Sequence, residues 1–308
     1  MDKWQERSLA RRERRRRQLR IRIAAGGIGL ILAVAALFAW IFSRSWETEK
    51  ADSPVRIVTV ISESEEESSS ESLEIFSPAH SPDVRDVYAL DPGNRDWNYK
   101  PQEEKTVYLT FDDGPSYITP MVLEVLEKYK VRATFFVTSQ SPPDAHYILE
   151  AYQKGHTIGL HSSSHSFEIY ASEESYYDDL RRIGEVVRDQ IGYIPCFIRF
   201  IGGSSNEKSG NYSRGIMTLL SESVQEKGYQ YWDWNGDLGD GTEVTAEQAV
   251  ENALSAASGT IVLLAHDGPN KESTVEALPK IIEGFRERGY VFKPLTREAT
   301  VIHHTVLN

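Results

Sequence analysis

Hydrophobic runs alternate with amphipathic stretches along the chain from Lys105 onward. Seven runs are typical of buried strands: VYLTF, ATFFVT, HTIGLH, CFIRFI, GYQYWDW, TIVLLAH and YVFKPL. Between most of them lie segments with helical periodicity, at 119–130, 144–155, 173–192, 245–258 and 274–289. Alternating strands and helices predict an α/β fold with a parallel sheet, either open or closed into a barrel. The strand count is one short of a full eightfold barrel.

The pattern differs at the N-terminus, where a basic segment at residues 1–22 precedes an uncharged apolar run at residues 23–42. About 20 apolar residues match the thickness of the hydrocarbon core of a bilayer. A cleaved signal peptide has a shorter apolar region that ends in small residues, whereas this run ends in FAWIF. We therefore expect a single uncleaved transmembrane helix in the cell membrane. The basic tail would be cytoplasmic and the C-terminal part extracellular.

Residues 43–104 form a third region, which includes the low-complexity acidic run SESEEESSSESLE and is rich in Ser, Glu, Asp and Pro. This composition predicts a disordered linker, followed by a folded domain at residues 105–308. The net charge of −12 argues against a nucleic-acid partner. The single cysteine, Cys196, excludes an intramolecular disulfide and a cysteine-based zinc site, and we expect a buried thiol.

Ionisable residues recur at the C-terminal ends of five predicted strands. In parallel α/β folds this edge of the sheet collects ligand-binding and catalytic groups. The sequence therefore predicts an active site at this edge. The residues concerned are the pair Asp112 and Asp113, then His161, Arg199, Asp233 with Trp234, and His266.

A metal site is one interpretation of the HSSSH segment, in which His161 and His165 are four residues apart. Two histidines and one carboxylate are a common ligand set that leaves positions open for water and substrate. The alternative is a pair of hydrogen-bonding loop histidines. The Asp112–Asp113 pair favours the metal, because one carboxylate could bind it while the other accepts a proton from water. Gly114 would supply the turn that brings both carboxylates to one site.

Arg199 ends an apolar strand, where an unpaired guanidinium is costly. We expect it to pair with Asp112, either to orient a catalytic carboxylate or as a structural ion pair. His266 is a candidate general acid, because its ordinary pKa lies near neutrality. Asp233 could stabilise the charged form of this histidine, with the adjacent Asp267 as the rival.

Five short motifs, and their order along the chain, resemble those of the polysaccharide deacetylases of carbohydrate esterase family 4, also called the NodB-like domain. The resemblance covers Lys105 to Thr296. The motifs are TFDDGP at 110–115, HSSSH at 161–165, RFIGG from Arg199, the Asp233–Trp234 pair in YWDW, and Leu264 with His266 in LAH.

The resemblance implies a distorted (β/α) barrel of about seven parallel strands and a set of residue roles. It implies a divalent metal, zinc or alternatively cobalt, bound by Asp113, His161 and His165. The implied catalytic base is Asp112 tethered by Arg199, and the implied acid is His266 tuned by Asp233. Trp234 and Leu264 would line the acetyl pocket, and a backbone N–H near Gly202 would bind the oxyanion. One departure is Ile201, which stands where the family commonly has proline.

The expected activity is metal-dependent removal of N-acetyl groups from a surface polysaccharide. The topology favours peptidoglycan N-acetylglucosamine as substrate. Other N- or O-acetylated glycans, such as chitin oligomers or acetylxylan, are the alternatives. A non-catalytic glycan-binding scaffold is the alternative from another class. A scaffold would be expected to lack the base, a metal ligand or the acid, and this sequence retains all of them.

Overall fold

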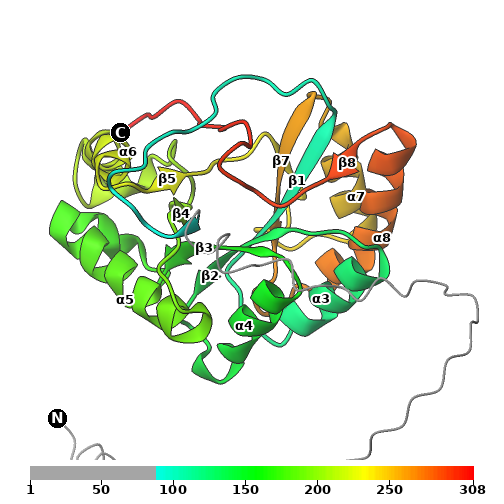
Figure 1. The fold of residues 1–308 in the computed structure, drawn as a ribbon, viewed down its shortest axis with the longest axis horizontal. Coiled ribbons are helices and arrows are strands. Elements are labelled where there is room, and N and C mark those ends of the chain that lie inside the picture. The colour runs from blue at the N-terminus through cyan, green and yellow to red at the C-terminus, as the bar shows by residue number, and fades with distance from the viewer. Residues whose placement is uncertain (1–87) are drawn as a thin grey trace, which may run out of the picture. The chain divides into compact units, whose positions relative to one another are not determined.

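The computed structural model describes residues 88–308, in which the strands form one curved parallel sheet (Figure 1). Seven strands follow the order β5-β4-β3-β2-β1-β7-β6, and β8 pairs with the first residues of β1. Their bounds are β1 Thr106–Asp112, β2 Thr134–Thr138, β3 Thr157–Ser162, β4 Phe197–Ile198, β5 Gln230–Tyr231, β6 Gly236–Asp237, β7 Thr260–His266 and β8 Val291–Phe292. The sheet is an α/β half-barrel, in agreement with the expected incomplete barrel of parallel strands.

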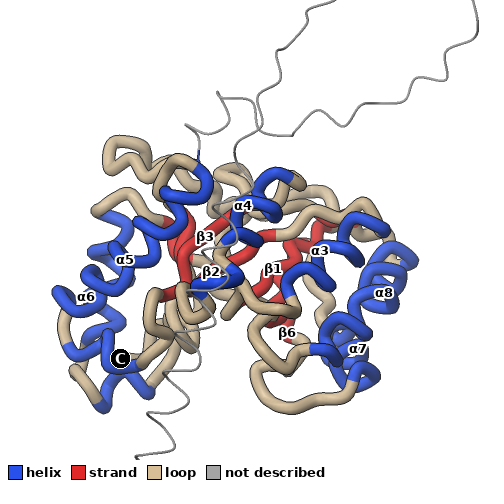
Figure 2. Tube along the Cα trace, turned by 90° about the horizontal axis from the view of Figure 1, so that it is seen from below, coloured by secondary structure: helices blue, strands red, loops and turns tan. Residues whose placement is uncertain are grey.

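Six α-helices of the described residues lie on the outer side of the sheet, with α5 and α6 at one end and α7 and α8 at the other (Figure 2). They are α3 Thr119–Lys128, α4 His146–Gln153, α5 Glu173–Ile191, α6 Ile216–Glu226, α7 Ala246–Ser255 and α8 Glu272–Glu287. Three short 3₁₀ helices are η1 Pro142–Asp144, η2 Phe167–Ala171 and η3 Lys208–Asn211. Within residues 88–308, no helix has both the length and the hydrophobicity needed to span a membrane.

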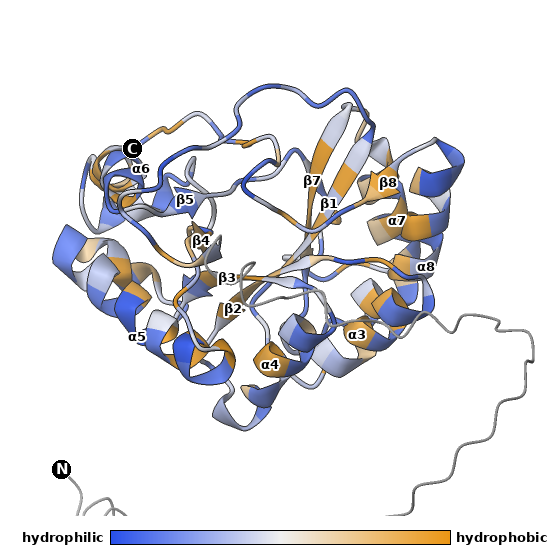
Figure 3. Cartoon of the chain, in the orientation of Figure 1, coloured by the Kyte–Doolittle hydropathy of each residue, from blue (hydrophilic) through white to orange (hydrophobic). Residues whose placement is uncertain are grey.

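The helices form where the sequence supplies caps and an amphipathic face. In α5, Ser172 and Ser175 make a reciprocal capping box at the start, and Gly192 ends the helix in the left-handed conformation. The apolar faces of the helices point to the sheet and the polar faces to solvent (Figure 3).

Strand alternation gives the sheet two different cores. Along β1, Val107, Leu109 and Phe111 pack in the cluster beneath the helices, whereas Tyr108 packs in a second cluster inside the barrel. Because successive side chains point to opposite faces, Asp112 shares the inner face with Tyr108. The inner cluster therefore lies on the same face of the sheet as the ionisable residues expected at the strand ends.

The expected boundary between linker and domain at residue 105 is wrong, because the preceding segment packs on the folded domain. Tyr88 and Trp97 lie against Phe197, with ring centroids 5.6 and 5.9 Å apart, and Cys196 donates its N–H to the Tyr88 carbonyl at 2.9 Å. The Pro- and Asp-rich composition concealed these two aromatic anchors. Cys196 itself is fully buried as expected, and burial raises the pKa of its thiol to about 12. The expected tail, membrane helix and remaining linker lie outside the described residues.

Candidate active site and metal centre

The two adjacent aspartates reach one site because the backbone reverses between them. Asp112 is the last residue of β1 and lies on its inner face. Asp113 has a φ of 72°, in the left-handed region, which brings its side chain back toward the same pocket. This conformation costs a non-glycine residue about 1 kcal/mol or more. The next residue is Gly114. A Cβ atom at this position would lie only 2.3 Å from Oδ2 of Asp267, so the turn requires glycine there.

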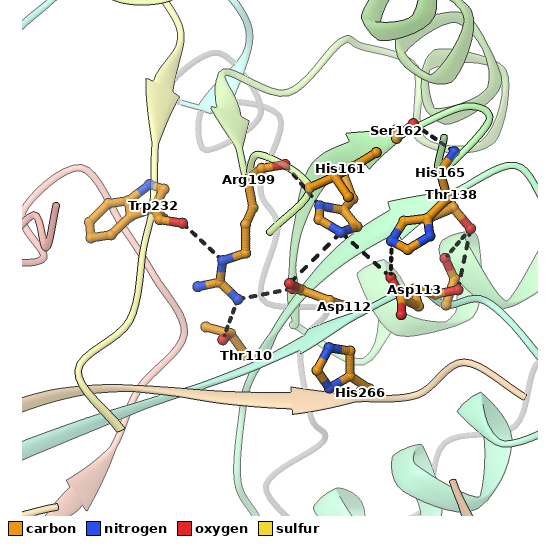
Figure 4. A network of polar contacts seen from close by, with 12 residues as sticks. Thr110, Asp112, Asp113, Thr138, His161, Ser162, His165, Arg199, Trp232 and His266 are labelled. Carbon is orange, nitrogen blue, oxygen red and sulfur yellow. Dashed lines mark hydrogen bonds and ion pairs between the residues drawn. The ribbon is translucent and has the colours of Figure 1, made fainter. Parts of the chain in front are cut away.

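Asp113, His161 and His165 present three ligand atoms within 4.8 Å of one another (Figure 4). Oδ1 of Asp113 lies 3.5 Å from Nε2 of His161 and 2.9 Å from Nε2 of His165, yet it is buried without a well-formed hydrogen bond. Nδ1 of His161 lies 2.8 Å from the Arg199 carbonyl, which it can contact only as a donor, so Nε2 keeps its lone pair. A carboxylate and two imidazoles in this arrangement fit a divalent cation, as the sequence predicted.

The protonation states of Asp113 and His161 favour a cation, whereas a proton on His165 competes with one. Burial raises the pKa of Asp113, but its contact with His165 and the charge of His161 outweigh burial and lower the pKa. Burial lowers the pKa of His161, which keeps the imidazole neutral. Burial also opposes protonation of His165, but contact with Asp113 outweighs it and raises the pKa of His165. A bound cation would displace that proton, because a ligating imidazole is neutral.

Arg199 is fully buried and makes the expected ion pair with Asp112, at 2.9 Å between Nη1 and Oδ1. Its guanidinium also donates to the Thr110 hydroxyl at 2.7 Å and to the Trp232 carbonyl at 2.9 Å, and it lies 4.3 Å from the ring centre of Phe136. These contacts hold Oδ1 of Asp112 and leave Oδ2 facing the metal site, 4.0 Å from Nε2 of His161. Figure 4 shows Asp112 between Arg199 and the two histidines.

His266 ends β7 beside Asp112 of β1 in the strand register, and its acidic partner is Asp240. Nδ1 of His266 lies 2.7 Å from Oδ1 of Asp240, and the backbone N–H of His266 donates to Oδ2 at 2.9 Å. The Thr274 hydroxyl donates to the same Oδ2 at 2.6 Å. Burial opposes protonation of His266, but the hydrogen bond and charge of Asp240 outweigh it and raise the pKa to about 9. His266 is therefore a protonated donor at neutral pH, suited to general acid catalysis.

The expectation that Asp233 tunes His266 is wrong. Asp233 accepts from the Ser204 N–H at 2.8 Å, the Ser204 hydroxyl at 2.5 Å and the His304 N–H at 2.8 Å. Nδ1 of His304 is 3.9 Å away. Asp233 thus fastens the loop after β4 to the C-terminal segment. The other rival, Asp267, instead accepts a hydrogen bond from the Thr119 hydroxyl at 2.6 Å.

Sequence reasoning missed Asp240 because β6, the strand that delivers it, consists of a glycine and an aspartate and lies outside any apolar run. β6 pairs with β7, with Asp237 opposite Leu264, so the chain three residues later reaches the end of β7. The available signal was an aspartate between two glycines, Gly239 and Gly241, just before the helix that precedes the strand with the histidine.

The predicted pocket residues occupy different places around the site. Leu264 is buried on the inner face of β7, two residues before His266. The Trp234 ring lies 5.6 Å from the guanidinium carbon of Arg199 and 4.8 Å from the His304 ring. Gly241 lies next to the ring of His266, because a Cβ atom at this position would be 3.4 Å from Cε1 of His266.

Gly202 lies in a β-turn at the wall of the site. The Gly203 N–H donates to the Phe200 carbonyl at 2.9 Å, which places Ile201 and Gly202 at the two central positions. Gly202 has a φ of 76°, the conformation that the third residue of a type II turn requires. The second position of such a turn favours proline but accepts other residues. Ile201 is therefore compatible with the turn that the family builds with proline.

These groups define a class of enzyme. A cation site, a carboxylate fixed by arginine and a protonated histidine fixed by aspartate surround one point at the ends of β1, β3 and β7. Within residues 88–308 this is the one cluster of three His, Cys, Asp or Glu ligands close enough to hold a metal ion. The arrangement is that of a cation-assisted hydrolase with a separate general base and general acid.

Comparison with known proteins places the chain in a family. Residues 99–216 match the polysaccharide deacetylase family. A peptidoglycan-N-acetylglucosamine deacetylase of Bacillus cereus is 33% identical over 198 residues, which are 62% of this chain and 87% of the relative. The chain belongs to the polysaccharide deacetylase family, and it is an enzyme of that family.

Solved structures agree with this assignment. The catalytic domain of peptidoglycan N-acetylglucosamine deacetylase from Eubacterium rectale is 41% identical, with a TM-score of 0.67. That match covers 71% of this chain and all of the other. The polysaccharide deacetylase Bc1974 of Bacillus cereus is 29% identical, with a TM-score of 0.53 and coverage of 62% and 92%.

Proposed function

We propose that this enzyme hydrolyses the N-acetyl group of N-acetylglucosamine in peptidoglycan and releases acetate. The observation that carries the proposal is the convergence of Asp112, His266 and the three cation ligands on one point. Amide hydrolysis needs a proton acceptor for water and a proton donor for the leaving nitrogen, and the site supplies both. The choice of peptidoglycan is supported by the names of relatives that match over most of their length.

The residues divide the reaction between them. A cation held by Asp113, His161 and His165 would lower the pKa of a water and polarise the acetyl carbonyl. Asp112 accepts the proton of the attacking water through Oδ2, while Arg199 holds Oδ1. His266 donates its Nε2 proton to the departing nitrogen, because Nδ1 is committed to Asp240 at 2.7 Å.

The proposal includes zinc as the cation, with cobalt as the alternative, since two imidazoles and one carboxylate suit both. It also includes attachment to the cell membrane through residues 23–42, with the basic tail inside and the catalytic domain outside. The long apolar run and the preceding arginines support this topology. Removal of residues 1–42 should release the enzyme from the membrane fraction of cells, and retention there would refute the anchor.

The catalytic proposal is tested by measuring acetate released from peptidoglycan, chitin oligomers and acetylxylan by the full chain, with and without zinc. Zinc-dependent release from peptidoglycan above the other two is expected. Asp112→Asn should abolish release while leaving bound zinc unchanged. Asp178→Asn, a charge removal on exposed α5 surface, is the matched control and should keep full activity. Loss of zinc in Asp112→Asn would show that the two carboxylates have exchanged roles.

A further inference from the structure

One buried carboxylate outside the site binds all three serines of the HSSSH loop. Asp179, on α5, is 1% exposed. Its Oδ2 accepts from the Ser162 hydroxyl at 2.6 Å and the Ser163 N–H at 2.8 Å, and its Oδ1 accepts from the Ser164 N–H at 3.0 Å. Arg182 adds an ion pair to Oδ1 at 3.1 Å. The whole span between the two metal-ligand histidines is therefore fixed to one side chain.

The two histidines depend on this loop to different degrees. His161 is the fifth residue of β3, and its ring is held by the Arg199 carbonyl. His165 lies beyond the strand with a φ of 51°, and in the described part of the chain its Nδ1 has no hydrogen-bond partner. Its backbone N–H donates to the Ser162 hydroxyl oxygen at 2.8 Å. Apart from the contact of its Nε2 with Asp113, His165 is placed by its backbone, which is tied through Ser162 to Asp179.

The chemistry of position 179 requires a carboxylate. Three donors of the loop and one of Arg182 converge on two oxygens, and an ionised carboxylate can accept all of them. An asparagine cannot, because one of its two terminal atoms is an NH₂ donor. If that amide nitrogen replaces Oδ2 it faces the Ser163 N–H, and if it replaces Oδ1 it faces the Ser164 N–H. Either orientation therefore opposes a backbone donor of the loop and displaces the loop.

We propose that Asp179 is a positioning residue for the metal centre, which holds His165 in place for the cation by fixing the loop that separates the two histidine ligands. This inference rests on the cation site of the proposed function. It predicts that Asp179 sets metal affinity, although its own contacts are with the loop and Arg182. A merely structural aspartate would instead change stability and leave the zinc affinity of the folded protein unaltered.

The experiment measures zinc affinity of the full chain by competition with a chromophoric chelator, together with the melting temperature of the zinc-free protein. Asp179→Asn should weaken zinc binding by about 10-fold to 100-fold, the usual effect of losing an outer partner of a metal ligand. Asp178→Asn is the matched control, because it removes the same charge one residue away from an exposed side chain. The control should bind zinc as the wild type does. A folded Asp179→Asn protein with wild-type zinc affinity would overturn the proposal.

A second variant decides the case if Asp179→Asn does not fold. Ser162→Ala removes the hydroxyl that links Asp179 to the His165 N–H and leaves the two backbone hydrogen bonds of Asp179 in place. It should weaken zinc binding by a smaller factor, and unchanged affinity would overturn the proposal. Failure of the wild type to bind zinc would refute the metal centre itself. Equal zinc binding by wild type and Asp179→Asn would instead refute only the positioning role of Asp179.

Discussion

Asp240 and Asp233 are both completely buried and both follow short strands, yet they contact different kinds of group. Asp240 contacts the ring of His266, the acid of the proposed reaction. Asp233 contacts backbone N–H groups and a hydroxyl that join the β4 loop to the C-terminal segment. A buried carboxylate therefore acts on catalysis or on stability according to its partner, and proximity to a strand end does not distinguish the two. Variants of each can test the difference.

The largest expected effect is on turnover in Asp240→Asn. The substitution keeps the shape of the side chain but removes the charge that stabilises protonated His266. We expect kcat to fall by about 100-fold, the scale of a lost general acid. The alkaline limb of the rate profile should move to lower pH by roughly one unit or more. Zinc affinity should be unchanged, since Asp240 contacts neither a proposed ligand nor the loop between the two histidine ligands. An unshifted alkaline limb would contradict the assignment.

The corresponding change at the other aspartate, Asp233→Asn, should act mainly on stability. Three donors lose a charged acceptor, and each such hydrogen bond contributes about 1.5 kcal/mol or more. Because the asparagine oxygen still accepts from part of these donors, we expect the free energy of unfolding in urea to fall by about 3 kcal/mol, less than the full sum. The pH limbs of activity in the folded protein should stay where they are. If instead the alkaline limb moved as in Asp240→Asn, Asp233 would share the tuning of the acid.

The pH dependence of stability separates the two regions without a rate measurement. The pKa of His266 is raised from 6.5 to about 9 in the folded state. A raised pKa means that the His266–Asp240 contact stabilises the fold fully below pH 6.5 and is lost as pH rises through 9. The difference in unfolding free energy between wild type and Asp240→Asn should shrink across this window. The difference between wild type and Asp233→Asn should not.

The smallest expected effects come from removing one hydroxyl donor from each aspartate. Thr274→Val removes a donor to Asp240, and Ser204→Ala removes one to Asp233. Each should lower the unfolding free energy by about 1 kcal/mol. Only Thr274→Val should also lower kcat, by roughly threefold to tenfold, because only it loosens the partner of the acid. Equal kcat values for the two variants would contradict the distinction between a catalytic role of Asp240 and a stabilising role of Asp233.

The architecture could be predicted where hydrophobic periodicity was strong. All seven expected strands are present, and five expected helices appear as α3, α4, α5, α7 and α8. α6 was missed because its helical segment follows a run of Gly, Ser and Asn and mixes polar with apolar residues. β6 was missed because its two residues, a glycine and an aspartate, lie outside any apolar run. The membrane helix at 23–42 stays a prediction.

The site could be predicted as far as strand ends determine it. Asp112, Asp113, His161, Arg199 and His266 converge as expected, because parallel strands bring their carboxyl ends to one edge. Partners delivered by loops were not predictable in the same way. Asp240 and Asp179 reach their partners through the packing of β6 on β7 and of α5 on the HSSSH loop, which no local pattern encodes.

The segment at 88–104 has a mechanical consequence. Just after Tyr88, the first described residue, Ala89 bridges to Pro195 and Leu90 donates to the Ile194 carbonyl at 2.8 Å. A pull on the chain from its N-terminal side would load these bonds at the start of β4 before any tension reached β1. The strand that carries Asp112 and Asp113 would therefore be shielded from that tension.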